Sequence, residues 1–241
     1  MRLSLAAAFL ALTAAPAGVA VAQTGTPSTA PAPTDWTTRI ERTAEGGHRM
    51  GNPQAPVKLV EYASIGCSHC ADFNSAAGEA LRERHVRSGR VSWEVRPYII
   101  SPGDPGMFLL LQCQAPEHFF ATSDRLFATQ QAWQARIDAA MPQLRTLPDV
   151  LSQMRGVTRA SGVDQLFKER GMSEAQIAAC LADEAGLERI VEAQEAAMEM
   201  GVEGTPTFFI NGRMLPPVDW AQLEPMLAAE PAAGGGGTPG E

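Results

Sequence analysis

The sequence predicts an α/β domain that is interrupted by an all-helical insertion. A strand–helix–strand pattern lies before residue 102, and a helix, a β-hairpin pattern and a second helix follow residue 187. The stretch between them shows helix-like runs punctuated by Pro and Gly and no convincing strand. We therefore assign residues 34–102 and 187–229 to the α/β domain and residues 103–186 to the insertion.

The first α/β segment reads as a strand, a helix and a second strand. Apolar, β-branched and aromatic residues favour strands over residues 57–63 and 91–98, and a helix is expected over residues 68–86. Residues 88–90, which include a glycine, supply a stop between this helix and the second strand. A crossover helix between the strands predicts that they are parallel neighbours.

The second α/β segment begins and ends with a helix. Apolar residues recur near helical spacing at its start, and they are Leu187, Ile190, Val191, Ala197 and Met198. The dipeptide Asn211-Gly212 lies between apolar residues 207–210 and residues 213–215, which is a strong signal for a two-residue β-hairpin. Residues 218–229 are expected to close the domain as a helix.

Both ends of the chain differ in composition from a folded domain. Residues 1–22 have a basic start, an Ala- and Leu-rich apolar stretch and small residues at the end, which is typical of a cleaved signal peptide. A membrane anchor is the alternative, but Pro16 and Gly18 interrupt the apolar run before it reaches the roughly 20 residues that span a bilayer. We expect residues 23–33 to be a disordered linker and residues 230–241 a disordered tail.

The charge balance argues against a nucleic-acid partner. The chain has 19 basic and 27 acidic residues and a net charge of −8. Residues 1–22 contain one Arg and no acidic residue, so the exported chain would carry about −9. The sequence contains no basic stripe with interleaved aromatic residues, which is the usual footprint of nucleic-acid binding.

The most informative pattern in the chain is Cys67-Ser68-His69-Cys70. It follows an apolar strand and opens a helix, where unpaired backbone N–H groups and the positive end of the helix dipole stabilise a thiolate. We therefore expect Cys67 to be the nucleophile and Cys70 to attack the mixed disulfide that Cys67 forms with a substrate. His69 is expected to stabilise the thiolate further through a hydrogen bond or positive charge.

Half of a zinc site and a structural disulfide are the two other interpretations of this pattern. Zinc needs a second pair of ligands, and Cys113 and Cys180 are far apart in sequence and belong to no such pair, so we expect no metal and no cofactor. The flanking strand and helix disfavour a purely structural bridge. Four cysteines in an exported chain allow three pairings, and the local pair leaves Cys113 with Cys180. Three further histidines show no ligand spacing and are expected at the surface or at helix caps: His48, His85 and His118.

Together these features resemble the thioredoxin fold, because Gly204-Thr205-Pro206-Thr207 enters a strand and an Asn-Gly hairpin after an upstream strand, CxxC motif and helix. The insertion, the signal peptide and the Cys-x-His-Cys centre are similar to those of DsbA-like thiol–disulfide oxidoreductases of the bacterial periplasm. The resemblance covers residues 34–229. It implies a thioredoxin-like domain, a periplasmic location, and a monomer that oxidises reduced exported proteins. It also implies a membrane or periplasmic redox partner that recycles the disulfide.

The same resemblance implies roles for residues outside the CxxC motif. Pro206 would be cis beside the redox disulfide, with Thr205 offering backbone hydrogen bonds to an extended substrate, whereas an ordinary trans turn is the alternative. Some members of the family have a second disulfide in the insertion. By analogy Cys113 and Cys180 would form a structural bridge, and a regulatory or electron-relay role stays open.

Glu61 lies six residues before Cys67, where this superfamily tends to keep a buried acid under the active site. In a strand it shares a face with Val57 and Leu59, so its carboxyl would lie on an apolar side. Burial would raise its pKa and suit it to a general acid/base role in shuttling the proton of Cys70. A solvated glutamate at a strand edge is the alternative, and both stay open because a central strand is buried on both faces.

The leading functional interpretation is an enzyme that donates the Cys67–Cys70 disulfide to folding exported proteins. Thr205 departs from the oxidase pattern, because Thr rather than Val precedes the proline in the isomerase and reductase branches. Those isomerases carry an N-terminal dimerisation domain, which residues 23–51 are too short to form. The third interpretation is a non-enzymatic periplasmic holdase or assembly factor with a merely structural disulfide.

Overall fold

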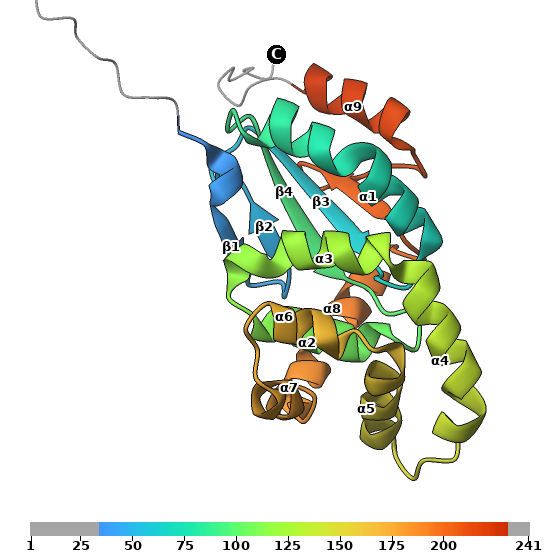
Figure 1. Cartoon of the computed structure of the whole chain (residues 1–241). Helices are drawn as coiled ribbons and strands as arrows, with labels where there is room; N and C mark the ends of the chain where they lie inside the picture. The colour runs from blue at the N-terminus through green and yellow to red at the C-terminus, as the bar shows by residue number, and fades with distance from the viewer. Residues whose placement is uncertain (1–33, 231–241) are drawn as a thin grey trace, which may run out of the picture. The chain divides into compact units, whose positions relative to one another are not determined.

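A mixed six-stranded sheet lies at the centre of the structure, a computed structural model that describes residues 34–230 (Figure 1). The strand order is β1-β2-β4-β3-β5-β6. The bounds are β1 (Ile40–Arg42), β2 (His48–Met50), β3 (Val57–Ala63), β4 (Val91–Pro97), β5 (Thr207–Ile210) and β6 (Arg213–Met214). Strands β3 and β4 are parallel, as the crossover helix predicted, and the other neighbouring pairs are antiparallel. Asn211 and Gly212 both adopt positive φ in the hairpin between β5 and β6.

The expected signal peptide (1–22), the linker (23–33) and residues 231–241 of the expected tail lie outside the described residues. At the C-terminal end, Glu230 is held in place, because its backbone oxygen accepts from Arg90 at 2.9 Å and its carboxylate pairs with Arg213 at 3.1 Å. Residue 230 therefore belongs to the ordered domain rather than to a disordered tail. Within residues 34–230, no helix is both long and apolar enough to cross a membrane.

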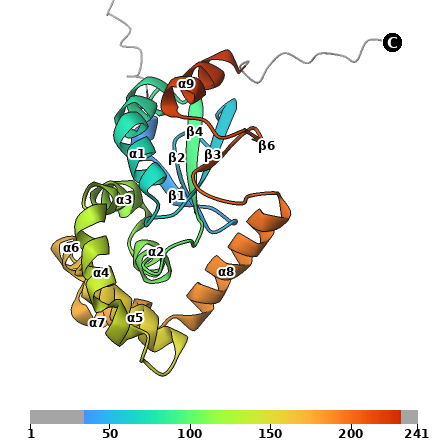
Figure 2. The same ribbon diagram turned by 90° about the vertical axis from the view of Figure 1, so that its right-hand side faces the viewer.

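Helices cover both faces of the sheet, and the alternation of side chains along the strands decides which helix covers which face. Glu61 of β3 lies opposite Phe208 of β5, and Phe208 packs against Phe73 of α1 (Ser68–Ala80) with ring centroids 4.6 Å apart. Tyr62 points the other way and belongs to a cluster with Ala197 of α8 (Glu184–Glu199). Helices α1 and α8 accordingly lie on opposite sides of the strands (Figure 2).

The helix that follows the CxxC motif changes its hydrogen bonding near its end. Helix α1 covers Ser68–Ala80 and continues as a π-helical segment over Leu81–Val86, so the expected helix over residues 68–86 is present without a break. It packs against α9 (Trp220–Ala229), which begins two residues later than expected because Asp219 caps it. The side chain of Asp219 accepts a hydrogen bond from the backbone of Gln222 at 2.9 Å.

Two histidines expected at the surface or at helix caps are instead buried and cap no helix, so that prediction is wrong for both. His48 is 1% exposed and stacks on Phe119, the first residue of α3 (Phe119–Ala128), at a centroid distance of 4.0 Å. Burial lowers the pKa of His48 to about 3, which keeps the ring neutral. His85 is covered by α9, where its Nε2 atom lies 3.3 Å from a carboxylate oxygen of Glu224.

The described chain between β4 and α8 is helical, which confirms the fold class predicted from the sequence. The helices are α2 (Asp104–Cys113), α3 (Phe119–Ala128), α4 (Gln130–Leu144), α5 (Val150–Ser161), α6 (Asp164–Glu169) and α7 (Glu174–Cys180), with a 3-10 turn over Pro116–His118. Helix α2 is buried along most of its length and is packed by α3, α5, α7 and α8. Helix α8 begins at Glu184 because Asp183 caps it by accepting from the Gly186 amide at 2.9 Å. The domain boundary expected at residue 187 therefore falls inside the first turn of α8.

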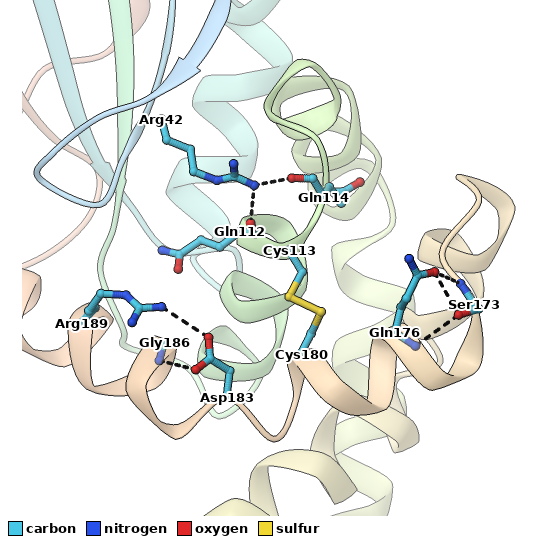
Figure 3. Close-up of a disulfide and its surroundings, with 10 residues drawn as sticks. All are labelled: Arg42, Gln112, Cys113, Gln114, Ser173, Gln176, Cys180, Asp183, Gly186 and Arg189. Atoms are coloured by element: carbon cyan, nitrogen blue, oxygen red, sulfur yellow. Dashed lines mark hydrogen bonds and ion pairs between the residues drawn. A yellow bond between two sulfur atoms is a disulfide. The ribbon is translucent and has the colours of Figure 1, made fainter.

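A disulfide joins the last residues of α2 and α7 (Figure 3). Cys113 and Cys180 are bonded with their Cα atoms 6.2 Å apart. The guanidinium of Arg42, at the end of β1, donates to the backbone oxygen of Gln112 at 2.6 Å and also to that of Gln114. A cation at this position complements the negative C-terminal end of the α2 dipole. The C-terminal end of α2 is thus fastened to both α7 and β1.

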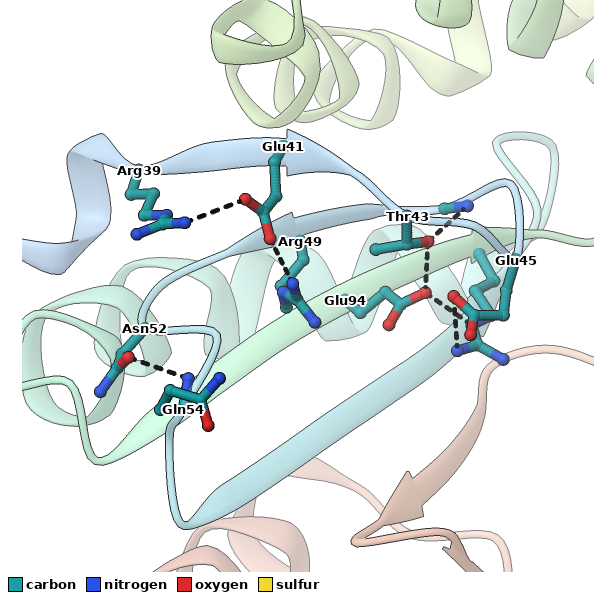
Figure 4. Close-up of polar contacts among 10 residues, drawn as sticks. Arg39, Glu41, Thr43, Glu45, Arg49, Asn52, Gln54 and Glu94 are labelled. Atoms are coloured by element: carbon teal, nitrogen blue, oxygen red, sulfur yellow. Dashed lines mark hydrogen bonds and ion pairs between the residues drawn. The ribbon is translucent and has the colours of Figure 1, made fainter.

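The sequence did not predict strands β1 and β2, which are three residues long and carry charged side chains. Strand β2 pairs with the edge of β4, and polar contacts hold the β1–β2 hairpin there (Figure 4). The hydroxyl of Thr43 donates to Glu94 at 2.7 Å, and an ion pair joins Arg49 to Glu41. Pairing with a neighbouring strand, rather than a local hydrophobic pattern, determines these two strands.

Candidate active site

Cys67 is the N-cap residue of α1, and its side chain is 6% exposed. Its sulfur donates to the backbone oxygen of Thr205 at 3.2 Å in the thiol form. The neighbouring Cys70 thiol, as a donor to the sulfur, has the largest effect in lowering the pKa of Cys67 to about 5, with further help from the Thr205 side chain and the backbone N–H groups of Cys70 and His69. Burial opposes this effect. The start of α1 thus favours a thiolate at Cys67 at neutral pH.

Cys70 lies one helical turn further along α1 and is fully buried. Its pKa is raised, chiefly because burial disfavours the charged form, and the hydrogen bond to Cys67 and the charge of Glu61 act in the same direction. Both cysteines are free thiols in the structure. The two thiols therefore differ strongly in acidity, and Cys67 is the one that can act as a nucleophile.

The Thr205–Pro206 peptide bond is cis, as the resemblance implied. The loop that contains it lies beside Cys67, because the Thr205 carbonyl accepts from the Cys67 sulfur. The loop is closed by a hydrogen bond from the Thr207 hydroxyl to the backbone oxygen of Gly204 at 2.7 Å. The structure thus brings together a thiol and a backbone segment that are 138 residues apart in sequence.

Glu61 is buried in the sheet below the thiols, at 3% exposure, so the solvated-edge alternative is wrong. Burial raises its pKa to about 8 against the opposing effect of a hydrogen bond that Trp93 donates, and the charge of Cys67 raises it further. The carboxyl is therefore mainly protonated at neutral pH. It also acts electrostatically on Cys70, and the expected exchange of a proton with that thiol stays a prediction.

A groove with a volume of about 910 Å³ lies between the start of α1 and the cis-proline loop. Its lining is mostly apolar, and the aromatic residues that line it are Phe73, Phe208 and Trp220. His69, Thr205 and Pro206 line the same groove, so it adjoins the reactive sulfur. Such a groove is suited to an extended peptide segment.

The thioredoxin family model matches residues 43–229. The chain belongs to the thioredoxin family. The crystal structure of a protein-disulfide isomerase from Novosphingobium aromaticivorans is 29% identical, with a TM-score of 0.72, covering 78% of this chain and 98% of that chain. The structure of Wolbachia pipientis alpha-DsbA1 is 17% identical with a TM-score of 0.62, covering 76% of this chain and 89% of the other. The resemblance in fold to DsbA-like members of the superfamily is therefore confirmed.

A relative from Rickettsia bellii, whose name proposes protein-disulfide oxidoreductase activity, is 24% identical over 165 residues. That match covers 68% of this chain and 56% of the relative. This thioredoxin-family chain therefore spans about half the length of the Rickettsia relatives that it matches.

His69 contributes to this thioredoxin-type centre through its backbone N–H group, which is among the causes that lower the pKa of Cys67. Its imidazole is exposed and lines the groove. The expected stabilisation of the thiolate by the side chain stays a prediction.

The structure keeps the second disulfide of this family member away from the thiols. Helix α2 runs from Asp104, which contacts residues 64–67 before α1 (the active-site loop), to Cys113 at its far end. This distance corresponds to about 14 Å along a helix.

Among residues 34–230, no group of three or more His, Cys, Asp or Glu side chains could hold a metal ion.

Two polar residues of the insertion contact the active-site loop and were missed in the sequence. Asp104 binds Ser64 and Gly66, and Gln130 binds Ile65 and Cys67. Both lie near the start of a helix, where Asp and Gln are ordinary surface residues, so the local sequence carries no signal for these long-range contacts.

Proposed function

We propose that this chain is a periplasmic thiol–disulfide oxidoreductase that donates the Cys67–Cys70 disulfide to folding exported proteins. The asymmetry of the two thiols carries the proposal. Cys67 lies beside the groove with its pKa lowered to about 5, whereas Cys70 is fully buried with its pKa raised. Because a stabilised thiolate favours the reduced protein, the disulfide form is a strong acceptor of electrons.

The reaction starts from the disulfide form. A client thiolate attacks the Cys67 sulfur, the Cys67–Cys70 bond breaks, and Cys70 leaves and takes a proton from the buried Glu61 carboxyl. The second client thiolate attacks the client sulfur of the mixed disulfide and releases Cys67 as its stabilised thiolate. The client loses two electrons and the cysteine pair gains them. A membrane or periplasmic redox partner then removes these electrons and restores the disulfide.

The proposed clients are reduced or unfolded exported proteins that bind as extended segments. The apolar groove supports this substrate class because it adjoins the Cys67 sulfur and is lined by aromatic side chains. The Thr205 backbone lies within hydrogen-bonding distance of that sulfur, which suits it to align a client strand next to the reactive bond. A single copy contains all of these groups, so we propose that the protein acts as a monomer.

A disulfide isomerase or reductase is the second candidate. The name of the Novosphingobium relative, which is a protein-disulfide isomerase, and the threonine before Pro206 favour it. Equilibration with glutathione separates an oxidase from a reductase, because an oxidase pair would be mostly reduced at the glutathione ratio of an oxidising compartment. A pair that stays mostly oxidised there would support the reductase direction.

Oxidation of a reduced dithiol peptide by the disulfide form tests the proposal. Wild type should be active and Cys67→Ala inactive, while Cys113→Ala/Cys180→Ala is the control that keeps the redox pair. A holdase would instead protect unfolded clients from aggregation equally well with Cys67→Ala and would show no exchange. Export is tested by expressing the full chain in a bacterial host and locating it in the periplasmic fraction.

A further inference from the structure

Four consecutive residues before α1 are each hydrogen-bonded to a side chain of the helical insertion. The Asp104 carboxylate accepts from the Ser64 hydroxyl at 2.8 Å and from the Gly66 amide at 2.9 Å. The Gln130 side-chain amide donates to the backbone oxygens of Ile65 at 2.7 Å and Cys67 at 2.9 Å. The loop that carries the nucleophile is therefore held along its whole length by the insertion.

Both side chains are buried, at 0% exposure for Asp104 and 6% for Gln130. Asp104 is also anchored at its own end, where it accepts from the backbone N–H groups of Ile100 at 3.0 Å and Ser101 at 2.7 Å. The loop approaches this anchor so closely that a Cβ atom on Gly66 would lie 2.2 Å from the Cβ atom of Ser101. A buried and fully bonded carboxylate at a close contact leaves the loop little freedom to shift.

Gln130 holds the residue that matters for the chemistry. The backbone oxygen of Cys67 accepts from Gln130 and also from the Ala71 amide at 3.1 Å, which is the first hydrogen bond of α1. These two bonds fix the backbone of the N-cap residue from which the Cys67 sulfur projects. Gln130 begins α4, so an element of the insertion orients the N-cap residue of a thioredoxin helix.

We propose that Gln130 is a positioning residue for Cys67, through which the helical insertion keeps the reactive sulfur against the N-terminus of α1. The inference rests on the proposed function and adds a positioning residue to the same site. Without the Gln130 amide, the buried carbonyl groups of Ile65 and Cys67 each lose one donor, and the loop is expected to shift to recover hydrogen bonds. The sulfur would then turn away from the N–H groups of His69 and Cys70, and the pKa of Cys67 would rise.

Gln130 is a better probe than Asp104 because it is neutral. Replacing Asp104 would remove a charge near the sulfur and change the acidity of Cys67 for that reason alone. Replacing Gln130 with Met removes both hydrogen bonds and keeps a long side chain. The matched control is Gln114→Met, because Gln114 is also buried in the insertion, at 4% exposure, but its side chain accepts from Thr122 at 2.8 Å rather than contacting the loop.

The experiment measures the pKa of Cys67 in the reduced protein by thiolate absorbance, the alkylation rate at a pH near that pKa, and stability in urea. Gln130→Met should raise the pKa by about one unit, which corresponds to a roughly tenfold loss of thiolate below the pKa. Gln114→Met should lower stability and leave the pKa unchanged. If Gln130→Met does not fold, Gln130→Ala makes room for water at the two carbonyl groups and should shift the pKa in the same direction.

Equal pKa values in wild type and a folded Gln130 variant would overturn the inference and leave Gln130 a structural residue. An equal rise with Gln114→Met would overturn it too, because the effect would then reflect general destabilisation. Titration and alkylation of Cys67 need no client. Failure of the wild type to oxidise a dithiol peptide would therefore reject the proposed function, while the titrations would still decide the role of Gln130.

Discussion

Trp93 Nε1 donates a hydrogen bond to Glu61 Oε2 at 3.0 Å beneath the two thiols. The residues lie on the two parallel strands β3 and β4, and both are buried. This bond lowers the pKa of Glu61, but burial has the larger effect and raises it to about 8. The indole thus orients a carboxyl group that is mainly protonated at neutral pH, which is the state that the proposed proton transfer to Cys70 requires.

Replacing Glu61 with Gln should change how stability depends on pH. The folded pKa of Glu61 is raised from 4.5 to about 8, so its contribution to stability is fully present below pH 4.5 and is lost as pH rises through 8. In wild type the free energy of unfolding should fall by up to roughly 5 kcal/mol across this range because of this group. Glu61→Gln should remove that decline, because Gln does not titrate and its side-chain oxygen still accepts from Trp93.

Urea unfolding of the disulfide form at pH 5 and pH 9 measures this effect, since Cys67 does not titrate when it is oxidised. Glu83→Gln is a suitable control because Glu83 is exposed and pairs with Arg87 at the surface. A pH slope in Glu61→Gln equal to that of wild type would mean that the buried carboxyl is not the titrating group.

The reactivity of Cys67 should follow its own titration. Its pKa is lowered from 9.0 to about 5, so the thiolate's contribution to the stability of the reduced protein is fully present above pH 9 and is lost as pH falls through 5. Alkylation at Cys67 should reach half its maximal rate near pH 5, and Cys70 should stay unreactive at neutral pH. Rates that keep rising up to pH 9 would contradict the assignment of Cys67 as the stabilised thiolate.

Local patterns in the sequence were sufficient for the centre of the site. The CxxC motif between a strand and a helix was enough to distinguish Cys67 from Cys70, because the helix start acts on the first thiol. Whether Glu61 is buried or solvated could not be decided from the alternation of side chains, since a central strand is buried on both faces. The structure shows that its carboxyl is buried and bonded to Trp93. Asp104 and Gln130 could not be found at all, because they reach the loop across 38 residues or more. Strand β2 was missed for the same reason, since its pairing with β4 is non-local, and β1 joins the sheet through its pairing with β2.

The Cys113–Cys180 disulfide should stabilise the insertion without being needed for exchange at Cys67. The two cysteines close a loop with a sequence separation of 67, and the chain-entropy argument assigns such a loop about 4 kcal/mol. Cys113→Ala/Cys180→Ala should therefore unfold at lower urea yet still oxidise a dithiol peptide. Loss of activity in a folded double variant would mean that this pair relays electrons to the active site.

His69→Ser should make the centre a weaker oxidant, but it should raise the pKa of Cys67 only in part. The substitution removes the imidazole but keeps the backbone N–H, which is among the groups that lower the pKa of Cys67. A protonated or donating imidazole adds to that stabilisation, so its loss should move the pKa of Cys67 upward from about 5 but leave it well below 9.0, since the larger effect of Cys70 remains. Ser68→Ala changes the other residue between the cysteines, which is also exposed, and serves as the control. Thiolate absorbance measures the pKa of Cys67, and equilibration with glutathione measures the reduction potential of the pair. An unchanged pKa would show that the imidazole does not act on the sulfur, whereas a pKa at the ordinary thiol value would show that the backbone and Cys70 do not stabilise the thiolate.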